Sequence, residues 1–100
     1  MHTIVAKDES EALGFISYET DGYIDLLYTA PHCARQGVAS ALLAEAAIQL
    51  RRLEVSVLFT EASLVAAPFF SRHGFQVVEA QSVVRRGVAF QRLAMQRRLA

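Results

Sequence analysis

The chain has 100 residues, 53% of them hydrophobic and 9% aromatic, so it can form one small domain with a core and is too apolar for a disordered segment. Its formal net charge is zero but unevenly spread: residues 1–30 hold six acids and Lys7, whereas residues 31–100 hold nine arginines and four acids. The resulting balances, −5 and +5, make the second part the candidate anion binder, with a solvated arginine surface as the alternative.

Cys33 is the single cysteine, which excludes an internal disulfide, and no residues have metal-ligand spacing. His32 next to Cys33 is a poor catalytic pair, because adjacent side chains diverge. No signal-peptide pattern or membrane-spanning apolar run is present. We therefore expect a cytoplasmic protein with one domain, residues 1–100, and no metal or membrane partner. A nucleic-acid partner is not expected either, since no groove-reading helix or stacking platform accompanies the arginines.

Three strands open the predicted fold, at residues 3–7, 12–19 and 23–29. Gly14 marks a bulge or a close backbone approach in the second strand. Asp21-Gly22, between two apolar runs, predicts a two-residue hairpin turn, so the second and third strands are antiparallel.

From residue 36 to 53 the apolar residues recur at helical spacing in an alanine-rich segment, which predicts a long helix. Residues 55–60, apolar on both faces, predict a buried central strand. A short helix is expected over 64–73, ended by Gly74, and then two strands, 75–84 and 88–97, flank "RRG". The order β-β-β-α-β-α-β-β predicts an α/β fold with a mixed sheet, its middle strands parallel and joined by a crossover.

The start of the long helix has no acidic residue between Pro31 and Leu43. A helix N-terminus presents unpaired backbone N–H groups and a partial positive charge, and Gly37 lets an anion approach them closely. The segment therefore predicts a pyrophosphate site, the alternative being a loop with one glycine before an alanine-rich helix. It matches neither a Walker A loop nor a complete Gly-x-Gly-x-x-Gly motif.

The segment "LLYTAPHCARQGVASALL" resembles the acetyl-CoA-binding core of the GCN5-related N-acetyltransferases, whose signature is Gln/Arg-x-x-Gly-x-Gly/Ala. Gly37 and Ala39 match its last two positions. Ala34 departs from the first position, and Arg35 is the nearest basic residue.

A second segment, "EASLVAAPFFSRHGF", is similar to the family's Asn-x-x-Ala-x-x-x-Tyr-x-x-x-Gly-Phe block. Ser63 takes the Asn position and Phe70 the Tyr position, while Ala66 and Gly74-Phe75 match. The resemblance spans residues 3–97 and implies the family's acyltransferase fold and an acetyl-CoA-dependent N-acetyltransferase acting on an amine of a small molecule or a protein.

In such a fold the third and fourth strands splay apart, and pantetheine lies between them. The resemblance implies pairing of pantetheine with the backbone of the third strand, pyrophosphate on the helix N–H groups, and an arginine of the second helix near the phosphates. For Arg72 a solvated surface role is the alternative. The implied acetyl-CoA-binding residues are Leu27, Tyr28, Thr29, Arg35, Gln36, Gly37, Val38, Ala39, Ser40, Ser63, Phe70 and Arg72.

Acetyl transfer by direct attack of an amine needs a base and an acid but no covalent intermediate. Candidate bases are Glu61 and Asp25, with His32 and His73 as further possibilities, and Tyr28 is the candidate acid. Each has a structural alternative: a solvent-facing strand residue for Asp25, sheet packing for Tyr28 and helix-dipole pairing for His73. Phe70 cannot donate a proton where the family has Tyr, and a core aromatic is its alternative role.

Members of the family usually begin with a further strand and two helices, whereas this sequence opens at what resembles the second strand. Either a partner chain supplies that wall or the domain is a fragment or reduced form, and the uncovered apolar sheet predicts a homodimer. The alternative function is a catalytically degenerate CoA-binding or oligomerisation module. The amine acceptor stays open: acids near the first hairpin hint at a cationic acceptor, and surface solubility explains them equally well.

Overall fold

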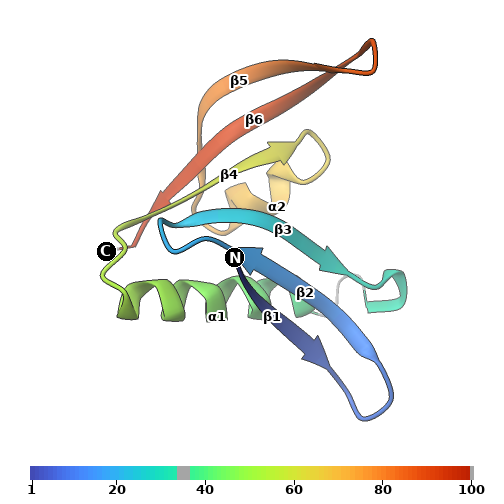
Figure 1. Ribbon diagram of the computed structural model, residues 1–100, viewed down its shortest axis with the longest axis vertical. Helices are drawn as coiled ribbons and strands as arrows, with labels where there is room; N and C mark the ends of the chain where they lie inside the picture. Colours follow the sequence, from blue (N-terminus) through green and yellow to red (C-terminus); the bar gives the residue numbers. More distant parts are fainter. Residues whose placement is uncertain (34–36, 100) are drawn as a thin grey trace.

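One mixed sheet and two helices make up the computed structural model, which describes residues 1–33 and 37–99 (Figure 1). Within these residues six strands form the sheet in the order β1-β2-β3-β4-β6-β5. The elements are β1 (His2–Lys7), β2 (Ala12–Tyr18), β3 (Tyr23–Thr29), the 3-10 helix η1 (Pro31–Cys33), α1 (Val38–Arg52), β4 (Val57–Ser63), α2 (Ala67–Arg72), β5 (Gln76–Arg85) and β6 (Val88–Arg98).

The predicted order of elements and the mixed sheet are confirmed. β3 and β4 are parallel and joined through α1, while the other neighbours are antiparallel. The boundaries shift by up to three residues: α1 begins at Val38, β4 runs from Val57 to Ser63, and α2 begins only at Ala67. Pro68 lies in the first turn of α2, where its fixed φ and missing N–H suit a helix start.

The turn between β2 and β3 has three residues, 20–22, rather than the predicted two. The Glu19 N–H donates to the Tyr23 carbonyl at 2.9 Å and closes the loop, while the Tyr23 N–H donates to the Asp21 carboxylate at 3.0 Å. In β2, Gly14 makes the close approach that the sequence suggested, because a Cβ there would collide with the Tyr28 carbonyl oxygen.

Both helices cover the same side of the sheet, and one core fills the space between. α1 packs on β1, β2 and β3, and α2 packs on β4 (Figure 1). The largest fully buried apolar side chains are Ile16, Ile24, Leu43, Leu50, Leu58 and Met95. Among the described residues, no helix is long and apolar enough to cross a bilayer.

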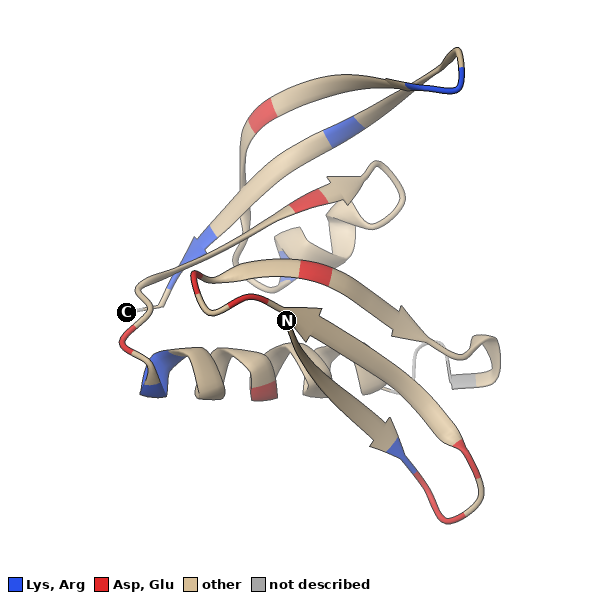
Figure 2. Ribbon diagram, in the orientation of Figure 1, with Lys and Arg blue, Asp and Glu red and all other residues tan. Residues whose placement is uncertain are grey.

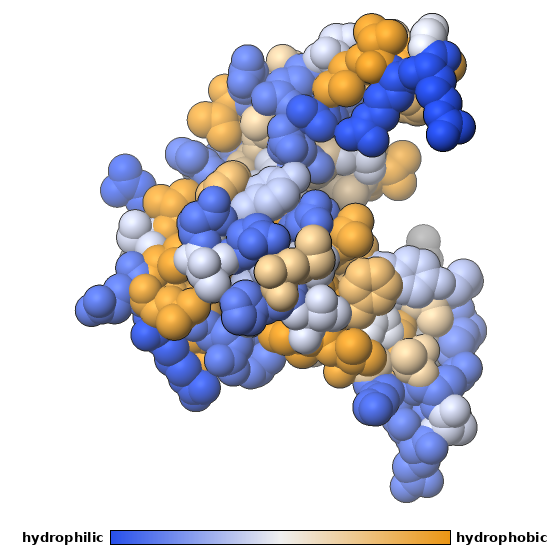
Figure 3. Space-filling model, in the orientation of Figure 1, coloured by the Kyte–Doolittle hydropathy of each residue, from blue (hydrophilic) through white to orange (hydrophobic). Residues whose placement is uncertain are grey.

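The prediction that β4 is buried on both faces is wrong. Leu58, Thr60 and Ala62 face the core, whereas Phe59, Glu61 and Ser63 alternate with them and are exposed. β4 is nevertheless central, between β3 and β6. We call the side of the sheet away from α1 and α2 the open face; it also carries Val5, Phe15, Leu26 and Tyr28, paired across β1–β3. Figure 3 shows apolar atoms exposed at the surface over the sheet.

Candidate functional site

The parallel strands β3 and β4 separate after a short contact. Their register has two pairs in the described chain, Tyr23 with Phe59 and Ile24 with Thr60. At the second pair the buried Thr60 hydroxyl donates to the Ile24 carbonyl at 2.9 Å. β3 then continues on β2 to Thr29, and β4 continues on β6 to Ser63. We call this opening the fork; it confirms the splayed strands that the resemblance implied.

Leu27, Tyr28 and Thr29 lie on the β3 arm of the fork, beyond its last pair with β4. The edge of a strand without a partner presents N–H and C=O groups that an extended amide can pair with. Leu27 and Thr29 are half-buried, while Tyr28 is 51% exposed and packs its ring against Phe15 at a centroid distance of 5.7 Å.

The N-terminus of α1 is capped by no side chain. Gly37 is the N-cap residue, with φ 79°, and the first turn contains no acid. Among the described residues, the first helical bond is from the Ala41 N–H to the Gly37 carbonyl, and the N–H groups of Val38, Ala39 and Ser40 precede it. A Cβ at Gly37 would meet no described atom within 4 Å, so the positive φ rather than crowding favours glycine. Arg35 and Gln36 lie outside the described residues.

A pocket of about 320 Å³ joins this helix end to β3 and α2. We call it the helix pocket; its lining is Thr29, Gly37, Val38, Ala39, Ser40, Phe69 and Arg72. The structure thus brings together most of the predicted pyrophosphate site with Thr29 and Arg72. The Ser40 hydroxyl lies 2.9 Å from Nε2 of His73, so the C-cap residue of α2 orients the hydroxyl in the first turn of α1.

Two predicted binding residues, Ser63 and Phe70, do not line the helix pocket. Phe70 is buried and packs edge-on against Phe69 and Phe75, as a core aromatic does. The Ser63 hydroxyl accepts the Ala66 N–H at 3.1 Å and supports the turn into α2. Phe69, which the sequence reading missed, lines the helix pocket instead; its spacing of three from Arg72 was the available signal, since such residues share a helix face.

Glu61 has both carboxylate oxygens engaged on the open face. The Tyr23 hydroxyl donates to Oε1 at 3.0 Å, and Arg92 Nη2 lies 2.9 Å from Oε2. Burial and the hydrogen bond to Glu61 raise the pKa of Tyr23. Asp25 is exposed on β3 and its charge also raises that pKa. Tyr23 and Arg92 were not predicted as partners of Glu61, because the register that joins β3, β4 and β6 is not a local property of the sequence.

His32 and the acids of the described residues are not grouped as a metal site would be. His32 is 2.8 Å from the Glu11 carboxylate, on the surface. In the described part of the chain, no three His, Cys, Asp or Glu side chains are grouped as metal ligands would be.

A family model described as an acetyltransferase (GNAT) domain matches residues 1–97. The chain belongs to the GNAT family. The N-acetyltransferase YafP of Escherichia coli (strain K12), named as uncharacterized, is 45% identical over 86 residues. These residues are 86% of this GNAT chain and 53% of YafP, so the chain spans about half the length of that relative.

Solved structures agree with the family. A GCN5-related N-acetyltransferase from Rhodopseudomonas palustris superposes with a TM-score of 0.91 at 25% identity, covering 97% of this GNAT chain and 61% of the other. A GNAT acetyltransferase from Elizabethkingia anophelis with acetyl-CoA bound has a TM-score of 0.74 at 12% identity, covering 97% and 75%. At 12% identity the likeness shows the fold alone.

Proposed function

We propose that this chain binds acetyl-CoA and provides the catalytic domain of an N-acetyltransferase that acetylates an amine of a small molecule or a protein. The helix pocket is the observation that carries the proposal: an uncapped helix N-terminus without acids, beside a fork in the sheet. Family membership and the acetyl-CoA bound to the structural neighbour from E. anophelis support it.

Three parts of the chain would hold acetyl-CoA. The N–H groups of Val38, Ala39 and Ser40 suit pyrophosphate oxygens, because they belong to the first turn of α1 and lie at its positive end. Arg72, at the rim of the same pocket, adds a cation. The β3 arm of the fork, residues 27–29, offers backbone groups to the pantetheine amides.

Acetyl-CoA supplies an activated acetyl thioester. In the transfer the amine nitrogen forms a bond to the acetyl carbon, the carbon–sulfur bond breaks, one proton leaves the amine and CoA departs as a thiol. Backbone N–H groups of the β3 arm would stabilise the oxyanion that develops. Asp25 is exposed near the vertex of the fork and is the better placed base, since both oxygens of Glu61 are already engaged.

A CoA-binding module without catalysis is the second candidate. The burial of Phe70 favours it, because the position that resembles the family's Tyr holds a core side chain that donates no proton. Tyr28, 51% exposed on the β3 arm, is the proposed acid if catalysis is retained. Release of CoA thiol that depends on an added amine separates the two candidates, since the module alone predicts none.

Calorimetric titration with acetyl-CoA and with desulfo-CoA tests the binding site. We expect about one site per chain for both ligands, and we expect Gly37→Glu to weaken binding at least about tenfold more than Gly37→Gln, a difference of roughly 1.4 kcal/mol. The two variants carry the same strain at φ 79° and differ in the carboxylate, which repels pyrophosphate. Equal affinities for the two folded variants, or no binding by the wild type, would contradict the proposed site.

A homodimer belongs to the same proposal. Large apolar side chains are exposed on the open face, among them Leu26 and Phe59, and the acidic first part of the chain complements the basic second part. A second copy of the chain supplies both an apolar surface and the opposite charge. Action in the cytoplasm stays a prediction from the sequence.

A further inference from the structure

A second pocket lies on the open face, between β4 and the β5–β6 hairpin, and encloses about 360 Å³. We call it the hairpin pocket; its lining is Glu61, Ser63, Val83, Arg85, Phe90, Gln91 and Arg92. It is separate from the helix pocket, with which it shares no lining residue. β4 lies between them: its core side faces the helices, and its other side carries Glu61 and Ser63.

A chain of hydrogen bonds holds the floor of the hairpin pocket in place. Tyr23 on β3 donates to Glu61 on β4, which pairs with Arg92 on β6 at 2.9 Å. Arg92 Nε donates to Gln81 on β5 at 2.7 Å. The two contacts of Arg92 use Nε and Nη2, which leaves Nη1 outside them. A guanidinium oriented in this way loses little further freedom when it binds a ligand.

The charges of the hairpin pocket favour an anion. It is lined by one carboxylate and two guanidinium groups, and the carboxylate of Glu61 is balanced by Arg92. Arg85 pairs with no carboxylate among the described residues. Val83 and Phe90 add apolar walls, and Figure 3 shows apolar and strongly hydrophilic atoms side by side at the hairpin end of the molecule. A ligand with a carboxylate and an apolar chain matches this combination.

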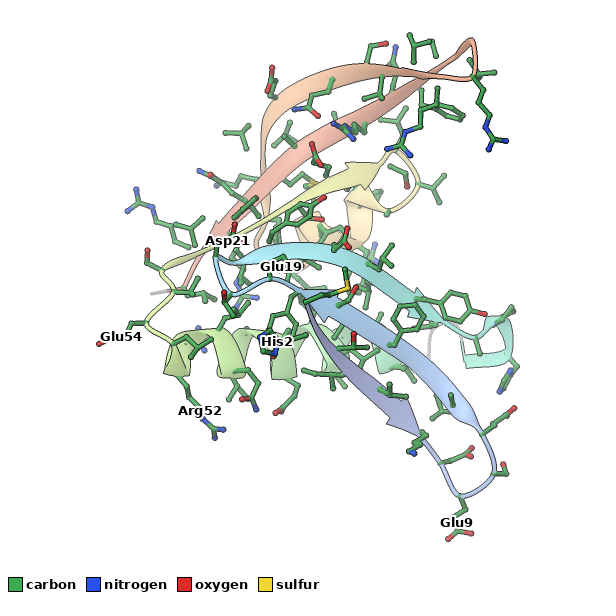
Figure 4. All side chains as sticks on the ribbon, in the orientation of Figure 1. His2, Glu9, Glu19, Asp21, Arg52 and Glu54 are labelled. Carbon is green, nitrogen blue, oxygen red and sulfur yellow. The ribbon has the colours of Figure 1, made fainter. Side chains whose placement is uncertain are left out.

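The acids of residues 1–30 do not argue for a cationic ligand. Figure 4 shows Glu9 at the tip of the β1–β2 turn, with Glu19 and Asp21 at the opposite end of β2. The seven residues of β2 separate these groups by roughly 20 Å. The acids at the two ends of β2 therefore form no single binding surface.

The hairpin pocket begins where the fork opens. Glu61 directly follows Thr60, which forms the last pair of β4 with β3. Glu61 opposes Ala94 on β6, whereas Arg85 opposes Val88, six residues farther along that strand. The backbones of the two residues are therefore roughly 20 Å apart along the strand. Because both residues nevertheless line the same pocket, their side chains must bridge much of this distance, and a ligand of several bonds can join an amine near Glu61 to a carboxylate on Arg85.

We propose that the hairpin pocket binds the acceptor, and that the acceptor is a primary amine joined by an apolar chain to a carboxylate. The inference rests on the proposed acetyltransferase function, and it adds the substrate class. Arg85 recognises the carboxylate, Val83 and Phe90 contact the chain, and Tyr23 with Glu61 faces the amine.

Three acceptors of equal chain length test the proposal: 6-aminohexanoate, hexylamine and 1,6-diaminohexane. We expect KM for 6-aminohexanoate to be about tenfold lower than for the other two, because only it carries a carboxylate. Arg85→Gln should remove this preference, while Arg86→Gln, one residue along in the exposed turn, should keep it. Equal KM values, a preference for the diamine, or a preference that survives Arg85→Gln would contradict the substrate class.

A binding measurement without acetyl-CoA separates this inference from the proposed function. Titration of the protein with hexanoate should shift the backbone amide NMR signals of Val83, Phe90 and Arg92, and Arg85→Gln should abolish the shifts. Absence of these shifts would overturn the hairpin pocket even if the enzyme is active. Their presence in a protein that binds no acetyl-CoA would support the pocket while the proposed function fails.

Discussion

At the scale of single residues, the partners of a side chain decide its chemistry more than its type does. Glu61 is a carboxylate on an exposed strand position, but its oxygens hold Tyr23 and Arg92. Arg92 and Tyr23 thereby gain fixed positions, and Glu61 becomes a positioning residue for both. Phe70 shows the same rule for an aromatic group, because Phe69 and Phe75 pack around it in the core.

The raised pKa of Tyr23 predicts a pH dependence of stability. Burial and the bond to Glu61 favour the neutral phenol in the folded state, so the stabilisation is complete below the ordinary value of 10.0 and is lost as pH rises through the folded-state pKa. The free energy of unfolding of the wild type, relative to Tyr23→Phe, should stay constant up to about pH 9 and fall above about pH 10. Urea denaturation across this range measures it.

Glu61→Gln serves as the matched variant for this experiment, because it removes the charge but keeps an acceptor oxygen. The free energy of unfolding of Glu61→Gln is compared with that of the double variant Glu61→Gln/Tyr23→Phe. This difference should fall less at alkaline pH than the difference between the wild type and Tyr23→Phe. If the free energy of unfolding of the wild type, relative to Tyr23→Phe, stayed constant up to about pH 11, the role assigned to burial and Glu61 would be contradicted.

At the scale of elements, the fork depends on how two strands stop pairing. β3 and β4 are held together at the vertex by two register pairs and by the side-chain bond from Thr60 to the Ile24 carbonyl. Beyond that point each strand follows another neighbour, β2 for one and β6 for the other. The opening proposed for pantetheine thus results from the register of four strands.

Thr60→Val should destabilise the fork. The variant keeps the shape of the side chain but leaves the buried Ile24 carbonyl without this donor, which costs about 1–3 kcal/mol of unfolding free energy. Thr60→Ser keeps the hydroxyl and removes one methyl group, at a cost of about 0.8 kcal/mol. Denaturant unfolding of both variants compares them; an equal or larger loss for Thr60→Ser would contradict the role of the hydrogen bond.

At the scale of the whole molecule, charge and apolar surface are segregated. Figure 2 shows acids in the turns of the β1–β3 part and basic residues at the tip of the β5–β6 hairpin. The helices cover one side of the sheet, and the open face keeps exposed apolar side chains. Such a surface favours association with a complementary copy.

Sedimentation measurements test the proposed homodimer. We expect a dimer at micromolar concentrations, weakened by salt because part of the attraction is between opposite charges. Leu26→Glu should shift the chain to a monomer, since Leu26 is 52% exposed on the open face. Leu53→Glu is the control: its side chain is 56% exposed at the end of α1 and should leave the dimer intact. A monomeric wild type, or equal effects of the two variants, would contradict the dimer.

The order of the elements, the uncapped start of α1 and the turn at Gly74 all follow from the amino-acid sequence. These are local properties: hydrophobic period, turn residues and the absence of acids act between residues a few positions apart. The proposed pyrophosphate site rests on the same kind of local property, because the amides of residues 38–40 are consecutive.

The open side of β4 and the pairing of Glu61 with Tyr23 and Arg92 come from tertiary contacts, as does the strand register that opens the fork. Glu61 is 38 residues from Tyr23, and their contact exists because β3 and β4 share a register. Which face of β4 is covered depends on where α1 and α2 pack, and VSVLFT is apolar enough for either outcome. Long-range register and packing come from the sum of many weak contacts across the sheet, and no single segment encodes that sum.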